Sequence, residues 1–385
     1  MCRPDGKTVR YGRLFELLDA LAGDVAYRHC GGCQANLTIV TASVDGFCNF
    51  HPIDVLHNIK MQGYITYVGS SSIEVAIDIV QMCEGGLICD EQKVLAKTNF
   101  IMVARDGNKS LKVPGLLLAN QQARDIFESG AERAKNRRVR AQQSLSVSPP
   151  RAEEVDLIHN LMLRGVGGAG VGVGGVGVGV GIGVGVEGQS MASTVFKSSQ
   201  LMQSQNRNVH GKIFGGYIMR KSFEIAYVSV TLFCREDYPQ LMFVDDIQFL
   251  KPINVGSVAE FSATVTYSRD SHVVVRVVAV TIDPISGLKV KTNVLNLIFK
   301  SKEPHPPTRN PTPNTGTSPT IPTTVYTIAA DPMNTAADPK GSVQVGYVTH
   351  KVLPSTYDEV MLYLEGKRSL DAFLGNSCGK GRCAI

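Results

Sequence analysis

Thr66-Tyr67-Val68-Gly69-Ser70-Ser71-Ser72-Ile73-Glu74-Val75 returns 200 residues later as Thr266-Tyr267-Ser268-Arg269-Asp270-Ser271-His272-Val273-Val274-Val275. At the same spacing, Val44-Asp45 matches Val244-Asp245, each inside an apolar run. A third pair follows in the same order and joins Lys97-Thr98-Asn99-Phe100 to Lys291-Thr292-Asn293-Val294. Self-similarity at a long period indicates repeated structural units, so these matches predict that one module occurs twice.

Each copy of the module is expected to hold one helix followed by a meander of strands. Apolar residues recur at helical spacing between Leu14 and Val25, and a second helix is expected over Gly215–Leu232. Runs rich in Val, Ile, Tyr and Thr predict strands at 37–44, 63–68, 73–81 and 94–104, and again at 241–249, 259–267, 273–282 and 289–300. The fold class is therefore α+β, with a curved antiparallel sheet wrapped around one central helix in each module.

Composition limits the classes of protein that fit. The chain has 385 residues, of which 43% are hydrophobic and 19% charged, so global disorder is excluded. A net charge of +5 is too small over this length to indicate a nucleic-acid partner. The nine cysteines are odd in number and scattered, which favours a reducing compartment over a secreted disulfide framework.

Low-complexity segments suggest where the modules end. We expect a first module over 1–115, a linker helix with a Gly/Val segment over 116–190, a second module over 191–303, a disordered Pro/Thr-rich insertion over 304–349, and a tail over 350–385. The uncharged run 165–186 is long enough to span a bilayer, but 12 of its residues are Gly. Glycine disfavours a helix, so no membrane span is expected.

The linker helix, expected over 121–143, carries five basic residues. They are Arg133, Lys135, Arg137, Arg138 and Arg140. One interpretation is a surface that binds phosphate or acidic groups, and the other, which we favour, is a solvated linker helix.

Two features of the sequence suggest chemistry before any family is considered. Gly215-Gly216 opens the second helix, and the free N–H groups of a first helical turn can hold a developing oxyanion. Asp19 lies among the leucines of the first helix, where a carboxylate at the edge of an apolar pocket could deprotonate water. An ordinary tight turn and a solvated helix boundary are the simpler alternatives.

Four segments resemble the hotdog-fold acyl-CoA thioesterases. Asn208–Arg220 is similar to the entry of the central helix in that family, and Val244–Ser257 to the following strand and turn. Val9–Asp19 occupies the matching position in the first module, and Pro354–Gly366 resembles the tail. Together they resemble the double-hotdog mitochondrial acyl-coenzyme A thioesterase 9 group. That family's first strand and transit peptide should precede Val9, so the first module is expected to be N-terminally truncated and to lack an edge strand.

The resemblance implies one competent site per chain. Asp19 falls on the position of the family's catalytic Asp, and Asn208 on that of the Asn contributed by the other module. The backbone N–H of Gly216 or Tyr217 would stabilise the oxyanion. The reciprocal positions hold Phe223 and about Pro4, which cannot do this chemistry, and Glu224 is the alternative carboxylate.

Binding of the coenzyme A phosphates is expected from Lys251, Arg269 and Ser271, which follow strand ends in the second module. No cofactor and no metal are required. Cys30 and Cys33 have the spacing of a zinc half-site, but no second half-site follows.

The sequence thus predicts an enzyme that hydrolyses acyl-CoA to free fatty acid and CoA. The resemblance implies a mitochondrial location and a homo-oligomer, a trimer of two-domain chains. The alternatives are a non-catalytic acyl-CoA-binding protein or inactive paralogue fragment, and a hotdog dehydratase, for which no carboxylate stands at a matching distance from His210.

Overall fold

The computed structural model describes residues 9–32, 37–51, 53, 57–82, 93–107, 109–145, 147–167, 188–208, 211–235, 239–301 and 351–375. Most of the Gly/Val run and the whole Pro/Thr-rich segment lie outside these residues, as do His210 and Cys33. None of the described helices is long and apolar enough to cross a membrane.

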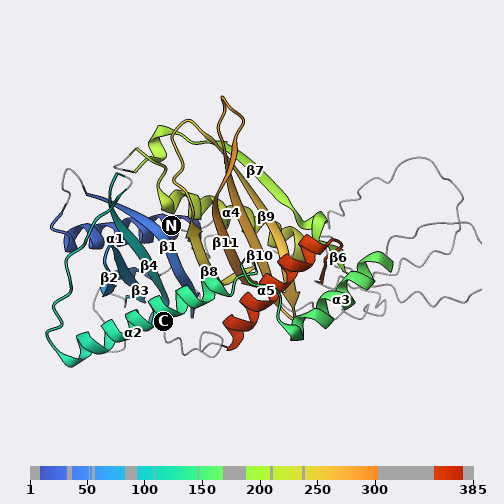
Figure 1. Cartoon of the computed structure of the whole chain (residues 1–385), viewed down its shortest axis with the longest axis horizontal. Coiled ribbons are helices and arrows are strands. Elements are labelled where there is room, and N and C mark those ends of the chain that lie inside the picture. The colour runs from blue at the N-terminus through green and yellow to red at the C-terminus, as the bar shows by residue number, and fades with distance from the viewer. Residues whose placement is uncertain are drawn as a thin grey trace, which may run out of the picture.

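One curved sheet runs through both modules (Figure 1). Its strands lie in the order β2-β3-β4-β1-β8-β11-β10-β9-β7, with β5 paired to β4. The first module supplies β1 (Thr38–Asn49), β2 (Ile59–Val68), β3 (Ser72–Gln81), β4 (Val94–Asp106) and β5 (Lys109–Ser110). The second supplies β7 (Phe196–Leu201), β8 (Gln240–Phe249), β9 (Val258–Arg269), β10 (His272–Ile282) and β11 (Lys289–Lys300). The modules join where β1 and β8 pair antiparallel.

Two helices fill the concave face of this sheet, α1 (Tyr11–His29) and α4 (Gly215–Cys234). In α1, Leu14, Leu18, Ala22 and Ala26 recur every fourth residue and are fully buried, so one face of the helix packs on the core. The two helices pack against each other, and Arg220 of α4 forms a 3.2 Å ion pair with Glu16 of α1. The expected α+β architecture, a curved antiparallel sheet around a central helix in each module, is confirmed.

The strand pairing confirms two of the three sequence matches. Val68 pairs with Ile73 as Ser268 pairs with Val273, and Val44 pairs with Phe100 as Val244 pairs with Leu297. The spacing of 200 residues therefore holds from β1 to β3.

The third match is wrong by three residues. Asn99 pairs with Asp45 as Asn296 pairs with Asp245, so the counterpart of Asn99 is Asn296. Asn293 pairs with Phe249 as Ala96 pairs with Asn49. The connection between the third and fourth strands is shorter in the second module, which shifts the register, and three shared residue types did not reveal the shift.

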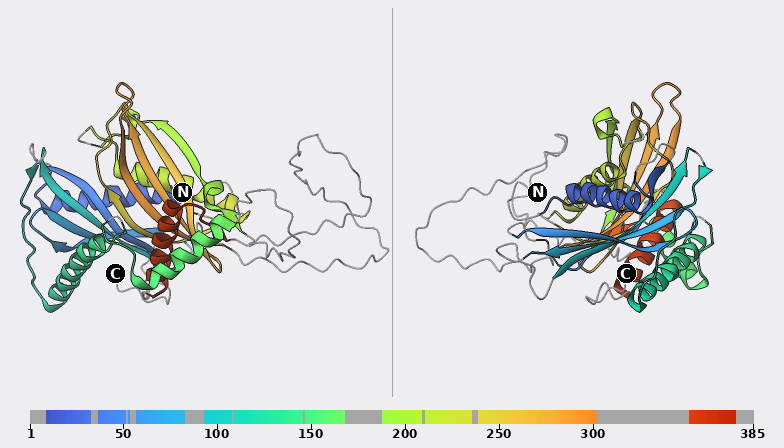
Figure 2. Two further views of the ribbon diagram at one scale, coloured as in Figure 1. Left: turned by 45° about the vertical axis from the view of Figure 1, so that its right-hand side comes forward. Right: turned by 90° about the vertical axis from the view of Figure 1, so that its left-hand side faces the viewer.

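The other helices cover the opposite face of the sheet (Figure 2). They are α2 (Gln121–Gln142), α3 (Ala152–Gly167) and α5 (Tyr357–Gly375). Leu370 and Phe373 of α5 pack on Tyr267, Val274 and Ile298 of the second module. The remaining short elements are β6 (Gln189–Ser190), β12 (Val352–Leu353) and the 3₁₀ turns Met191–Thr194 and Ser204–Asn206.

Three arginines of α2 face the sheet, so neither interpretation of this helix fits them. Arg133 and Arg137 each reach Glu74 at 2.7 Å, and Arg137 also reaches Asp45 at 2.8 Å. Arg140 pairs with Asp45 at 3.2 Å. Glu74 and Asp45 are buried, and buried carboxylates require such partners. These arginines hold α2 on the sheet, with Arg133 and Arg137 largely shielded from water and Arg140 half exposed.

Within the described residues, β2 ends the sheet on the side of the first module, whereas β7 lies beyond the equivalent strand β9 in the second.

Candidate active site

Asp19 is a buried carboxylate at the junction of the two modules. Although it is a carboxylate, its side chain is only 2% exposed, because it lies on α1 among buried apolar residues. The Thr41 hydroxyl donates a 2.7 Å hydrogen bond to Oδ1, and the Gly216 N–H donates a 2.6 Å hydrogen bond to Oδ2. One donor belongs to β1 and the other to the first turn of α4, so both modules hold this carboxylate.

Burial raises the pKa of the Asp19 carboxyl to about 6, and the hydrogen bonds from Thr41 and Gly216 oppose that rise. A carboxyl with a pKa close to neutrality can accept a proton from water and return it within one reaction cycle. The geometry and the charge environment of Asp19 therefore suit a general base.

The first turn of α4 approaches α1 closely because it begins with two glycines. A Cβ atom on Gly216 would lie 2.7 Å from the Cα of Glu16, and one on Gly215 would lie 3.0 Å from Oδ2 of Asp19. Larger residues at either position would separate the helix N-terminus from the carboxylate.

The hydrogen bonds of this turn engage both amides that the sequence analysis offered as oxyanion donors. The Gly216 N–H is engaged by Asp19, and the Tyr217 N–H donates to the Phe214 carbonyl at 3.1 Å. The Gly215 N–H makes no hydrogen bond to a described residue, as expected for the first amide of a helix. Gly215 lines the cavity, and its N–H is the amide of this turn that has no hydrogen-bond partner among the described residues.

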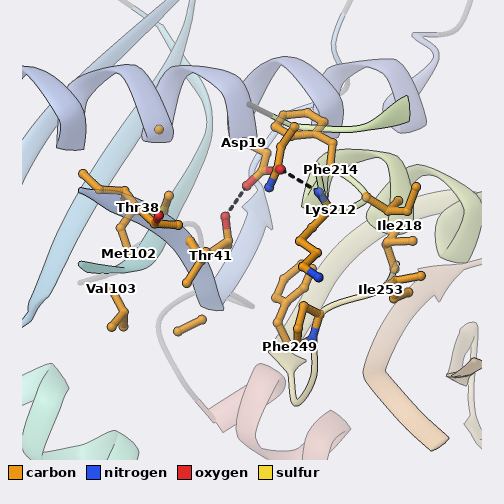
Figure 3. Close-up of a pocket in the computed structure, with 18 of the residues that line it drawn as sticks. Asp19, Thr38, Thr41, Met102, Val103, Lys212, Phe214, Ile218, Phe249 and Ile253 are labelled. Atoms are coloured by element: carbon orange, nitrogen blue, oxygen red, sulfur yellow. Dashed lines mark hydrogen bonds between the residues drawn. The ribbon is translucent and has the colours of Figure 1, made fainter. Parts of the chain in front are cut away.

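A cavity of about 850 Å³ opens beside Asp19 (Figure 3). Apolar side chains of both modules line most of it: Tyr27, Ile39, Met102 and Val103 on one side, and Phe214, Ile218, Phe249 and Ile253 on the other. In Figure 3, Thr38, Met102 and Val103 lie on the opposite side of Asp19 from Phe249 and Ile253. The carboxylate thus lies between apolar walls contributed by the two modules, a lining suited to an elongated apolar ligand.

Of the six site residues expected from the sequence, three line this cavity, Gly216 contacts Asp19 without lining it, and two lie elsewhere. Asp19, Asn208 and Lys251 all line it. Asn208 belongs to a tight turn in which its Oδ1 accepts from the Lys212 N–H at 3.1 Å. Arg269 and Ser271 do not line the cavity.

Arg269 and Ser271 lie at the turn between β9 and β10. Arg269 forms a 2.9 Å ion pair with Asp371 of α5, and the Ser271 carbonyl accepts from the Ser301 N–H. The sequence could not foresee that the tail helix would cover this turn.

Glu224, the alternative carboxylate, also lies away from the cavity. Arg220 and Lys221 bind it at 2.8 and 3.0 Å, and the Arg220 and Lys221 hydrogen bonds outweigh burial, so the pKa of Glu224 is lowered. A solvated, paired carboxylate of lowered pKa is a poor general base.

Several polar residues of the cavity escaped the sequence analysis. Thr41 touches Asp19 directly, and the cations Arg105, Arg207 and Lys212 line the cavity together with Lys251. Thr41 lies in an expected strand, but nothing in its local sequence distinguishes it from the other threonines of the chain.

The reciprocal position in the second module is closed by aromatic rings. Phe223 takes the place of Asp19 on α4, and its ring centroid lies 5.8 Å from those of both Tyr11 and Phe15. By strand register, Leu241 takes the place of Thr41, and Ala96 that of Asn293. Asp19, Thr41 and Asn293, which line the cavity, therefore all have apolar counterparts in the reciprocal position.

Among the residues that the structure describes, no group of three or more His, Cys, Asp or Glu side chains could hold a metal ion.

Comparison with known proteins identifies the family. Residues 210–287 match the Thioesterase superfamily model. Mitochondrial acyl-coenzyme A thioesterase 9 of Mus musculus is 30% identical over 371 residues, covering 94% of this chain and 71% of the relative. Its Homo sapiens namesake is 29% identical over 376 residues, covering 96% and 72%. An acyl-CoA hydrolase structure from Staphylococcus aureus, at 18% identity and a TM-score of 0.35, covers 49% of this chain and 91% of that one. The chain therefore belongs to the acyl-coenzyme A thioesterase 9 family, whose members are thioesterases that hydrolyse acyl-CoA.

Proposed function

We propose that this chain hydrolyses acyl-CoA to a free fatty acid and CoA at a single site, with Asp19 as the general base. The observation that supports this proposal is the buried Asp19 carboxylate of one module, which accepts a hydrogen bond from the helix N-terminus of the other beside a largely apolar cavity. Both ends of an acyl-CoA molecule can extend from this point, because its thioester lies between the acyl chain and the pantetheine arm.

In the proposed reaction, a water molecule near Asp19 attacks the thioester carbonyl carbon. Asp19 takes one proton from the water as the new C–O bond forms, and the carbonyl oxygen becomes an oxyanion that accepts from the Gly215 N–H. When this intermediate collapses, the C–S bond breaks and the electron pair leaves with the sulfur. Asp19 returns its proton to the thiolate, so no metal or covalent intermediate is required.

Two further roles follow from the lining of the cavity. Asn208 positions the water or the thioester through its side-chain amide. Lys251, Arg207 and Lys212 line the cavity on the side of the second module. They give that side a positive charge. We therefore place the phosphates of CoA on that side, where three of the four lining cations lie, because clustered cations favour phosphate. The acyl chain is placed on the side of Met102 and Val103, where Arg105 is the fourth.

We further propose that the chain divides into modules at the boundaries given above, that it is mitochondrial, and that it assembles into a trimer of two-domain chains. The names of the relatives support the location. The trimer rests on family resemblance alone, and sedimentation analysis of the purified chain tests it.

Release of free thiol from acyl-CoA by the purified chain tests the catalytic proposal. Asp19→Asn should lose most turnover while CoA binding persists. Glu224→Gln is the matched control, because Glu224 is a carboxylate on the partner helix that does not line the cavity, and it should hydrolyse normally. If the wild-type chain binds CoA but releases no thiol, the chain is a non-catalytic binding protein. If Asp19→Asn remains active, the assignment of the base is wrong.

A further inference from the structure

Asn293 is a buried amide on the wall of the cavity that the catalytic proposal does not use. It lies on β11, is 1% exposed, and lines the cavity. Its Nδ2 donates to the Gln248 carbonyl at 3.4 Å, while its Oδ1 has no hydrogen-bond partner among the described residues. A buried carbonyl oxygen without a donor is costly, so an unpaired one on a ligand-binding wall points to a donor on the ligand.

The neighbours of Asn293 fix which atom of its amide is unpaired. The Gln248 carbonyl can only accept a hydrogen bond, so the NH₂ group of Asn293 must face it. The oxygen is therefore the unpaired atom, and it requires a donor such as an N–H group.

Register places Asn293 between the reacting group and the cations. It pairs with Phe249, and the Phe249 ring lies 3.2 Å from the position of a Cβ atom on Gly215. The next residue of that segment, Leu250, donates to the Thr292 carbonyl at 2.8 Å, which holds Lys251 beside β11. A ligand that reaches from Asp19 toward Lys251 therefore passes Asn293.

The internal repeat supplies an independent argument. The counterpart of Asn293 is Ala96, which is fully buried, so the fold does not require an amide at this position. The polar residue occurs only on the side that also holds Asp19 and Thr41 in place of Phe223 and Leu241.

We propose that Oδ1 of Asn293 accepts a hydrogen bond from an amide N–H of the pantetheine arm of acyl-CoA, the amide closer to the sulfur. This inference rests on the proposed site at Asp19. Without this contact, the ligand's N–H would lose its hydrogen bond to water on entering the cavity and gain no other partner. Asn293 thereby recognises the coenzyme rather than the acyl chain.

Two matched thioesters test this contact. An acyl thioester of N-acetylcysteamine carries the N–H, and the corresponding thioester of O-acetyl-2-mercaptoethanol replaces it with an ester oxygen. For Asn293→Ala we expect kcat/KM on the amide thioester to fall about tenfold, a typical loss for one such hydrogen bond, with little change on the ester analogue. The inhibition constant of CoA itself should rise by a similar factor.

Asn99→Ala is the matched control. Asn99 is 3% exposed and its Nδ2 has no described partner, but it does not line the cavity. This variant should lower the melting temperature and leave the preference for the amide thioester unchanged.

The outcomes separate the two proposals. Equal loss by Asn293→Ala on both thioesters, or no change in CoA inhibition, overturns the role of Asn293. With Asp19→Asn inactive, the catalytic proposal then stands. If Asp19→Asn hydrolyses either thioester normally, the catalytic proposal fails, and the Asn293 contact fails with it.

Discussion

The Gly216 N–H donates a 2.6 Å hydrogen bond to Oδ2 of Asp19, across 197 residues of sequence and from one central helix to the other. The bond fixes the direction of a carboxylate that burial alone would neutralise. It also links the base of one module to the helix N-terminus of the other, so the two modules complete a single site.

The ionisation of Asp19 should control the pH dependence of turnover. Because the carboxylate must be ionised to take a proton, we expect kcat/KM to rise with pH through an apparent pKa near 6 and then level off. Initial rates of thiol release from pH 4.5 to 8 measure this profile. An activity that is flat across this range would contradict the assignment.

The same group should make folding stability depend on pH with the opposite sign. The pKa of Asp19 is about 6 in the folded chain, against 3.8 for an ordinary Asp side chain, so the unfolded chain ionises first and stability falls as pH rises from about 4 to 6. Asp19→Asn removes this loss of folding stability. The amide of this variant can still accept a hydrogen bond from the Gly216 N–H and donate one to the Thr41 hydroxyl. We expect it to gain up to about 3 kcal/mol at pH 7, measured by urea unfolding. A destabilised variant would show that the ionised form is the one the fold prefers.

The Thr41 hydroxyl should influence the pKa of Asp19 in addition to packing beside it. Its hydroxyl donates to Asp19 and lowers the pKa of that carboxyl. Thr41→Val should therefore move the acid limb of the activity profile up by roughly one pH unit, the equivalent of one hydrogen bond. Thr41→Ser keeps the hydroxyl and should keep the wild-type limb. If Thr41→Val and the wild-type chain have the same pH profile of activity, Thr41 does not have this role.

Restoring a carboxylate in the second module should not create a second site. Phe223 packs among aromatic rings, and the donor and amide positions around it hold Leu241 and Ala96. Phe223→Asp should add no activity and should cost about 4 kcal/mol or more, since it removes a buried ring and buries a charge. Thermal unfolding and thiol release measure the two effects, and any gain in turnover would refute the closed-site interpretation.

The α2 arginines should stabilise the fold through buried carboxylates. Arg137→Met leaves Glu74 and Asp45 partly unpaired and should cost roughly 3 kcal/mol. Arg138 is exposed and has no ion pair among the described residues, so Arg138→Met should change stability by less than about 0.5 kcal/mol. Chemical denaturation of both variants measures the two changes in unfolding free energy. If Arg137→Met costs no more than Arg138→Met, the ion pairs of Arg137 do not contribute to stability.

Local periodicity predicted the regular elements well because burial on one face imposes it. β10 alternates buried Val273, Val275 and Val277 with neighbours on the other face, and α1 places leucines on one face. The edge strand β7 escaped because its residues are mostly polar and only half buried. The third repeat match failed because strand register depends on the connection between strands, which residue similarity does not report.

The sequence by itself determined that one module occurs twice, because a repeat follows from order along the chain. Asp19 stood out as a charge among apolar residues, and Asn208 was named through the family resemblance. Only the tertiary structure decided which amide holds the carboxylate, that the Gly215 N–H has no partner among the described residues, and that Thr41 and Asn293 line the same cavity. It also assigned Arg269 to the tail helix instead of the cavity. Hydrogen bonds join atoms that are close in space, and most partners here are separated along the chain by distances that no local pattern encodes.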